Sequence, residues 1–293
     1  MKKIVFLTAV ILSLGLNNVW AESKGTEAVG AVDAPSKSIR TIKSPRFAHP
    51  LVEKWIEEYA KTEPGVEFQI VKGSAGQNNI DLTVTVSDKK EDAVIYIGKT
   101  AVLPITARSS EAARLLEGKH LNAKKLKQLF FLNDEFEEDV KKNKTFESIN
   151  VYSGSNVTSV ASSFAHNFGE ESANFRGKRI AGDDLFLNTA IAKDPLGVSF
   201  NTLSNIFDLK SRHLKSDLSL IGIDVKKNYA ESFSDEGSLD DVLAALESSN
   251  ISEVAIENVG ISYNGNDEAV NKFLSWVVEK GTKYNHQYGL LNR

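Results

Sequence analysis

The stretch SIRTIKSPRFAHPLVEKWIEEYA, residues 38–60, decides the fold class, because a strand pattern runs into a helix pattern through a short polar loop. Apolar and polar residues alternate from Ser38 to Ile42, which is typical of a strand. Pro50 suits the first position of a helix, and the apolar residues from Leu51 to Tyr59 then recur at helical spacing. A strand, a loop and a helix in this order form the repeating unit of an α/β protein.

The same alternation continues along the chain. Strand patterns such as Val66–Val71 and Gly197–Phe200 alternate with helix patterns after Asn122 and Ser238, two residues that suit helix caps. Such alternation predicts largely parallel sheets, with ligands bound beyond the carboxyl ends of the strands. Asp183 and Asp184 are expected to cap a helix rather than bind a cation or act as a base.

The beginning of the chain predicts export. Two lysines precede an apolar run from Ile4 to Leu16, and Val19 and Ala21 stand three and one residues before a possible cleavage site. The run is shorter than the roughly 20 residues that span a bilayer. We therefore expect a signal peptide (residues 1–21), a flexible spacer (22–37) and a periplasmic protein. The chain has no Cys, which excludes disulfides and a lipid anchor on an N-terminal Cys.

Composition and motifs argue against several classes of function, namely nucleic-acid binding, metal binding and hydrolysis. The net charge is −4 with both signs interspersed, so no basic stripe favours nucleic acid. The five His residues show no zinc-binding spacing, and we expect neither a metal nor a cofactor. Ser74 does not stand in a nucleophile elbow, and no nucleophile–base pair is recognisable, so an exported hydrolase is disfavoured. We expect a monomer that is not an enzyme.

Three loops contain residues that could donate hydrogen bonds to an anion. Ser44–Phe47 offers a hydroxyl and the guanidinium of Arg46, and Gly73–Gly76 and Ser153–Ser159 offer hydroxyls and glycine. Each follows a strand pattern, where backbone N–H groups at helix N-termini favour negative charge. Arg binds oxyanions with two parallel hydrogen bonds. The alternative is that these residues serve only as turns and caps.

The order of elements from Ser38 to about Gly289 resembles the substrate-binding proteins of phosphate ABC transporters, the PstS-like family. The resemblance rests on the Pro50–Tyr59 helix, the Glu63-Pro64-Gly65 turn, the Gly73–Gly76 loop, the Leu121–Phe131 helix, the Val151–Phe164 segment and the Asp194–Phe200 strand.

This resemblance implies an α/β, two-lobed, type II periplasmic-binding-protein-like fold with a hinge and an interlobe cleft. The first lobe would comprise residues 38–105 plus 218–293 and the second residues 106–217, with crossings near Thr106 and Leu218. Ser44, Phe47 and Ser74 would face the ligand from one lobe and Thr158 and Ser159 from the other. All candidate ligand-binding residues are Ser44, Arg46, Phe47, Ser74, Ala75, Gly76, Ser155, Asn156, Thr158 and Ser159.

Two departures from the family pattern lie in the second-lobe loop. The family's Arg is missing there, and Asn156 stands in place of an Asp. An amide can donate as well as accept a hydrogen bond. We expect a solute-binding protein that captures a small oxyanion, phosphate first, for an ABC permease. The alternative is a cell-envelope interaction or assembly protein that keeps the fold and has lost the ligand.

Overall fold

The computed structural model describes residues 39–71, 80–87, 94–132, 143–155, 159–263, 265 and 267–293. The expected signal peptide and spacer lie outside these residues. In the described part, no helix is both long and apolar enough to cross a bilayer. The buried apolar side chains of this part form two separate clusters, which we call the first core and the second core.

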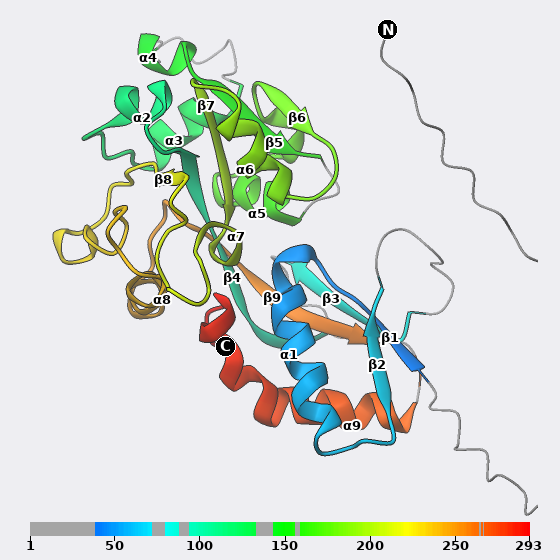
Figure 1. Cartoon of the computed structure of the whole chain (residues 1–293). Helices are drawn as coiled ribbons and strands as arrows, with labels where there is room; N and C mark the ends of the chain where they lie inside the picture. The colour runs from blue at the N-terminus through cyan, green and yellow to red at the C-terminus, as the bar shows by residue number, and fades with distance from the viewer. Residues whose placement is uncertain are drawn as a thin grey trace, which may run out of the picture. The chain divides into compact units, whose positions relative to one another are not determined.

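The first core lies between two helices and the strands beside them (Figure 1). Trp55 is buried, and its indole N–H donates to the carbonyl of Gly281 at 2.9 Å. Phe68 stacks on Phe273 with ring centroids 4.3 Å apart. The elements around this core are β1 (Ile39–Lys43), α1 (His49–Ala60), β2 (Glu67–Ile70), β3 (Leu82–Ser87) and α9 (Glu268–Trp276). Pro50 occupies the first turn of α1, as the sequence predicts.

The second core is larger and rich in phenylalanine. Phe164 and Phe200 stack with ring centroids 4.2 Å apart, and Phe130 meets Phe164 edge to face. The elements around this core are α2 (Glu111–Leu116), α3 (Ala123–Phe130), α4 (Lys144–Glu147), β5 (Asn150–Gly154), α5 (Ser159–Asn167), β6 (Lys178–Ile180), α6 (Leu185–Ala192), β7 (Gly197–Thr202), α7 (Leu203–Ile206), β8 (Leu218–Leu220) and α8 (Leu239–Ser248).

The described strands follow one sheet path in the order β2-β1-β3-β9-β4-β7-β5-β6, with β8 paired to β4. β1 runs parallel to β2 and β3, and β5 runs parallel to β6 and β7. β4 (Val94–Ala107) and β9 (Ala255–Tyr263) are antiparallel to their neighbours. The expected parallel pairing therefore holds at the two ends of the sheet and fails in its centre, where β9 runs antiparallel to β3 and β4, and β7 runs antiparallel to β4.

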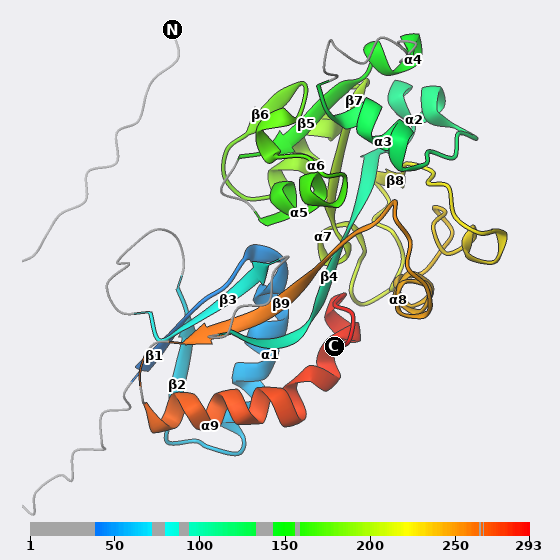
Figure 2. The same cartoon turned by 180° about the vertical axis from the view of Figure 1, so that it is seen from behind.

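β4 and β9 run from one core to the other (Figures 1 and 2). The sequence pattern predicts two strands in each place, namely Ala93–Ile97 and Thr100–Thr106, and Glu253–Ile256 and Val259–Tyr263. In the structure each is one continuous strand, with a bulge in β4 between Tyr96 and Gly98. The cores meet at the register pair of Thr100 and Glu257, two buried polar residues. Ser163 donates to the Glu257 carboxylate at 2.6 Å. The lobe limits at residues 105 and 218 stay a prediction.

The C-terminal segment packs against β4 near the place where the cores meet. Asn285 is fully buried, and its amide donates to the carbonyl of Ile97 at 2.8 Å. Leu291 forms an antiparallel bridge with Lys99. A Cβ at Gly98 would lie 2.6 Å from the Asn285 amide, so the close approach requires glycine. The C-terminal segment is therefore docked against β4.

Polar caps fix several helix starts. Ser238 and Asp241 form the predicted capping box of α8, and Asn122 accepts from the backbone N–H of Lys125 at 3.0 Å. The sequence pattern predicts a cap at Asn266 for the last helix, and this residue lies outside the described residues. In the structure Asp267 is the cap, and its Oδ1 accepts from the backbone N–H of Val270 at 3.0 Å.

Candidate functional site

The predicted loop after β1 connects the sheet to α1. Ser44 donates to the carbonyl of Pro45 at 3.1 Å, and Nε2 of His49 lies 2.9 Å from the Ser44 carbonyl. The side chain of Phe47 is buried in the first core, so only its backbone could meet a ligand. These contacts hold the loop in a compact turn that carries Arg46 outward.

Arg46 faces the part of the chain that surrounds the second core. Its side chain is 57% exposed, and Nε lies 3.7 Å from Oδ2 of Asp183. Asp183 stands between β6 and α6, and its Oδ1 accepts from the backbone N–H of Leu185 at 2.9 Å. Although Asp184 occupies the N-cap position of α6, its side chain makes no cap hydrogen bond, so the expected capping role is confirmed for Asp183 alone. The structure also gives it a second role, because the two side chains join elements of the two cores.

A buried network of amide side chains is hydrogen-bonded to the loop that contains Asp183. Asn201 is fully buried and donates to the carbonyl of Asp184 at 2.8 Å and to Oδ1 of Asn188 at 2.9 Å. Its own Oδ1 accepts from the backbone of Thr202 and from the amide of Asn205. A buried amide with every bond satisfied holds its neighbours in one arrangement.

The same network leads to a second link between the two cores. Ser204 donates from Oγ to the carbonyl of Phe47 at 3.1 Å and lies 3.4 Å from the hydroxyl of Thr202. Lys215 donates to the carbonyl of Asn205 at 2.7 Å, and burial lowers the pKa of this lysine. Ser204 therefore ties the start of α7 to the loop that carries Arg46.

The remaining predicted residues are described only in part. Ser74, Ala75, Gly76, Asn156 and Thr158 lie outside the described residues, and Ser159 is described only as the first residue of α5. Ser155 is half-buried after the end of β5.

The first residue of this loop, Ser153, has a buried hydroxyl. Ser153 is fully buried in β5, and its Oγ finds no hydrogen-bond partner among the described residues. Of the ten predicted residues, Arg46 through its side chain and Phe47 through its backbone carbonyl have described contacts that reach the opposite core. The described residues contain no group of three or more His, Cys, Asp or Glu placed to hold a metal ion.

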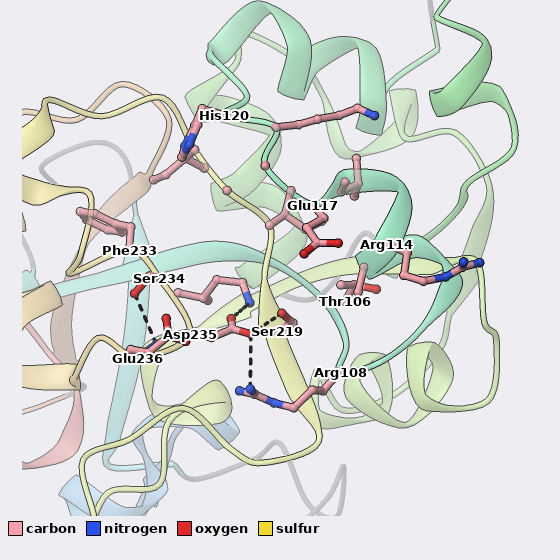
Figure 3. Close-up of a pocket in the computed structure, with 18 of the residues that line it drawn as sticks. Thr106, Arg108, Arg114, Glu117, His120, Ser219, Phe233, Ser234, Asp235 and Glu236 are labelled. Carbon is pink, nitrogen blue, oxygen red and sulfur yellow. Dashed lines mark hydrogen bonds and ion pairs between the residues drawn. The ribbon is translucent and has the colours of Figure 1, made fainter.

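A separate cavity of about 500 Å³ lies between the end of α2, β8 and residues 230–236 (Figure 3). Arg108 lies 3.5 Å from Asp235, which accepts from the Ser219 hydroxyl at 2.5 Å and the Leu220 N–H at 2.7 Å. Figure 3 shows the carboxylate of Glu117 turned toward the middle of the cavity. The wall formed by Arg108 and Asp235 thus fastens residues 230–236 to β8, and no described residue of the predicted site lines it.

Comparison with known proteins gives information on the fold. No family model matches the chain, and no curated protein matches its sequence. Among solved structures, the chain is similar to a candidate phosphate ABC transporter substrate-binding protein with bound phosphate from Clostridium perfringens, at TM-score 0.60 and 13% identity over 87% of this chain and 100% of that one. An ABC-type phosphate transport receptor from Vibrio cholerae gives TM-score 0.56 and 12% identity, again over 87% of this chain and 100% of that one.

The chain has the fold of ABC-transporter substrate-binding proteins. The resemblance found in the sequence is therefore confirmed for the two-lobed α/β fold. The regulatory domain of CcmR from Synechocystis, solved in complex with 2-PG, is also similar, at TM-score 0.50 and 12% identity over 82% of this chain and 95% of that domain. Because a regulator shares this fold, the fold alone does not determine the ligand.

Sequence reasoning found Arg46 and missed what faces it. The contact with Asp183 joins residues far apart in the chain, and a local pattern explains Asp183 fully as a helix cap. One signal was available: Gly182-Asp183 follows a three-residue strand, β6, and precedes α6, the same order of elements as the loop after β1. Ser204 gave no signal, because a hydroxyl at the start of a four-residue helix is common.

Proposed function

We propose that the chain is an exported solute-binding protein that captures a small oxyanion, phosphate first, and delivers it to an ABC permease. The observation that carries this proposal is the position of Arg46. Its exposed guanidinium follows β1, faces the elements of the other core, and makes no hydrogen bond to another described residue. The five N–H donors of an arginine suit an oxyanion better than those of any other side chain.

The physical requirement for such a site is a large number of donors. A dehydrated anion needs hydrogen bonds on all its oxygens, since a buried charge without partners is very costly. Backbone N–H groups and hydroxyls of the predicted loops would complete the set around Arg46. Two lobes that close over the ligand could supply donors from both sides, and the ligand would favour the closed form by its higher affinity for it.

Export belongs to the same proposal. A signal peptide cleaved after Ala21 would deliver the folded part to the periplasm, where such a protein meets its permease. The folded part would act as a monomer and would need no cofactor.

Titration calorimetry of the purified protein with phosphate, sulfate and molybdate tests the proposal. We expect phosphate to bind, and Arg46→Gln to weaken it at least about 10-fold, because a hydrogen bond to a charged group contributes about 1.5–3 kcal/mol. Arg40→Gln is the matched control, since Arg40 donates to Asp267 at 2.9 Å within the elements of the first core. Absence of heat with all three anions at millimolar concentration would remove the oxyanion claim.

A second function is favoured by one specific observation. Arg46 already has a carboxylate opposite it, and Ser204 already bonds the Phe47 carbonyl, so the two sides are linked without a ligand. Such a molecule could serve as an envelope interaction or assembly protein. It would show no anion binding, and a defined envelope complex would survive Arg46→Gln unchanged in a pull-down.

A further inference from the structure

The surroundings of Arg46 are not purely positive, because a carboxylate stands opposite its guanidinium. Its guanidinium stands 3.7 Å from the Asp183 carboxylate, and Asp184 follows directly in the chain. An inorganic dianion that binds Arg46 would lie close to the negative charge of Asp183. Like charges at such separation disfavour each other unless a proton or a cation lies between them.

The ion pair between Arg46 and Asp183 leaves both partners with unused bonding capacity. A distance of 3.7 Å exceeds that of a hydrogen bond, so the guanidinium keeps its donors. Oδ1 of Asp183 is engaged by the Leu185 N–H, but no described residue donates to Oδ2. The pair therefore presents an anion-binding group and a cation-binding group side by side.

An exposed aromatic ring stands beside Gly182, the residue that precedes Asp183. Phe186 is 52% exposed, although it belongs to α6 and is a large apolar residue. Its ring lies over Gly182, because a Cβ at that glycine would come within 2.9 Å of the ring. Gly182 has φ +104°, which also favours glycine. The ring is thus held beside the Asp183 loop, where it could cover a short carbon linker or lie against an ammonium group.

We infer that the ligand is a zwitterion, namely a small oxyanion that carries an ammonium group on a short carbon linker. The inference rests on the proposed oxyanion function and specifies its ligand class. Arg46 binds the oxyanion end, Oδ2 of Asp183 accepts from the ammonium end, and Phe186 packs against the linker. Each charge of the ligand then meets an opposite charge, whereas phosphate alone meets attraction on one side and repulsion on the other.

Calorimetry with three probes tests this inference: inorganic phosphate, ethyl phosphate and phosphoethanolamine. Ethyl phosphate has the same linker length without the ammonium group. We expect phosphoethanolamine to bind at least about 10-fold more tightly than both other probes, because a charge-assisted hydrogen bond adds to its affinity. Asp183→Asn should remove this preference and should leave phosphate binding unchanged or tighter, since the negative charge is gone.

Asp267→Asn is the matched control for Asp183→Asn. Asp267 also caps a helix and also pairs with an arginine, but its pair lies among elements of the first core. This variant should keep the full preference for phosphoethanolamine. Phe186→Ala should reduce the preference for phosphoethanolamine about threefold or more without affecting inorganic phosphate, because it removes only the contact with the linker and ammonium group.

The outcomes separate the two claims. Phosphate binding without a preference for phosphoethanolamine, or a preference that survives Asp183→Asn, overturns the zwitterion and leaves the oxyanion function standing. No binding of any probe overturns both. Because phosphoethanolamine is also a lipid headgroup, co-sedimentation with phosphatidylethanolamine vesicles distinguishes the two sources: capture indicates the lipid, and binding of the free compound alone indicates a soluble ligand.

Discussion

Two arginine–aspartate pairs in this molecule have the same components, but they differ in the distance between the guanidinium and the carboxylate. Asp267 and Asp183 each accept a backbone N–H of the helix that follows, at 3.0 and 2.9 Å. Arg40 donates to Asp267 at 2.9 Å, whereas Nε of Arg46 stays 3.7 Å from Asp183. The side chain of Arg40 is 17% exposed and that of Arg46 57%.

The role of each ion pair depends on whether it lies within one core or between the two cores. The Arg40–Asp267 pair joins β1 to α9 around one core, where a closed contact stabilises packing. The Arg46–Asp183 pair joins elements of two different cores. An open pair whose arginine is exposed contributes little stability, but its groups keep the capacity to bind a ligand. Changes in the Arg40–Asp267 pair should therefore affect the stability of the fold, and changes in the Arg46–Asp183 pair should affect ligand binding.

The largest expected effect on stability is at Asp267. Asp267→Ala should lower the free energy of unfolding by about 1–2 kcal/mol, because it removes a helix cap and a half-buried ion pair. Asp183→Ala should cost only about 0.5 kcal/mol, because Asp183 stands one residue before the N-cap position of α6 and its open ion pair contributes little. Chemical denaturation of both variants measures the difference, and equal losses would show that the two pairs do not differ in role.

The pH dependence of the free energy of unfolding tests whether the Asp267 carboxylate stabilises the fold as a charged group. The backbone N–H of Val270 and then the guanidinium of Arg40 hold the pKa of Asp267 below its ordinary value of 3.8. A carboxyl whose pKa is lower in the folded state stabilises the fold above its unfolded pKa and loses that contribution as pH falls. The wild type should therefore be more stable than Asp267→Asn at pH 7, and this advantage should shrink below about pH 4.

Denaturation series at several pH values measure this effect, with Asp240→Asn as a second carboxyl to compare. Hydrogen bonding from Arg212 lowers the pKa of Asp240, so its variant should show the same sign. A difference between wild type and Asp267→Asn that stays constant down to pH 3 would contradict the assignment of this carboxylate as a charged cap.

The sequence predicted local structure well wherever one segment supplies all the information. The α1 helix, the capping box at Ser238 and the loop that carries Arg46 follow from neighbouring residues alone. β4 and β9 were each divided in two, because Gly98 and Lys99 in one strand and Glu257 and Asn258 in the other interrupt the apolar pattern. These interruptions lie where the two cores meet, so the break in the pattern reflects a change of core rather than the end of a strand.

The candidate site was harder to predict because it depends on contacts between distant segments. Arg46 was found from its chemistry, but a local pattern cannot show that Asp183 stands opposite it. β6 has only three residues, too few for a periodic signal, so the loop after it was not recognised. The resemblance places Phe47 at the ligand, and because its ring fills the first core this stays a prediction for its backbone alone. The site thus combines a predictable donor with a partner that only the fold determines.

The smallest expected effect is at Ser204, the other link between the two cores. Ser204→Ala removes one hydrogen bond to the Phe47 carbonyl and should lower the free energy of unfolding by about 1 kcal/mol or less. Ser234→Ala is its control, because that hydroxyl bonds within its own loop to the carbonyl of Glu231. A loss at Ser204 as large as that at Asp267 would mean that this half-buried junction between the cores stabilises the fold as strongly as the closed pair does. The contrast between a folding pair and a binding pair would then no longer hold.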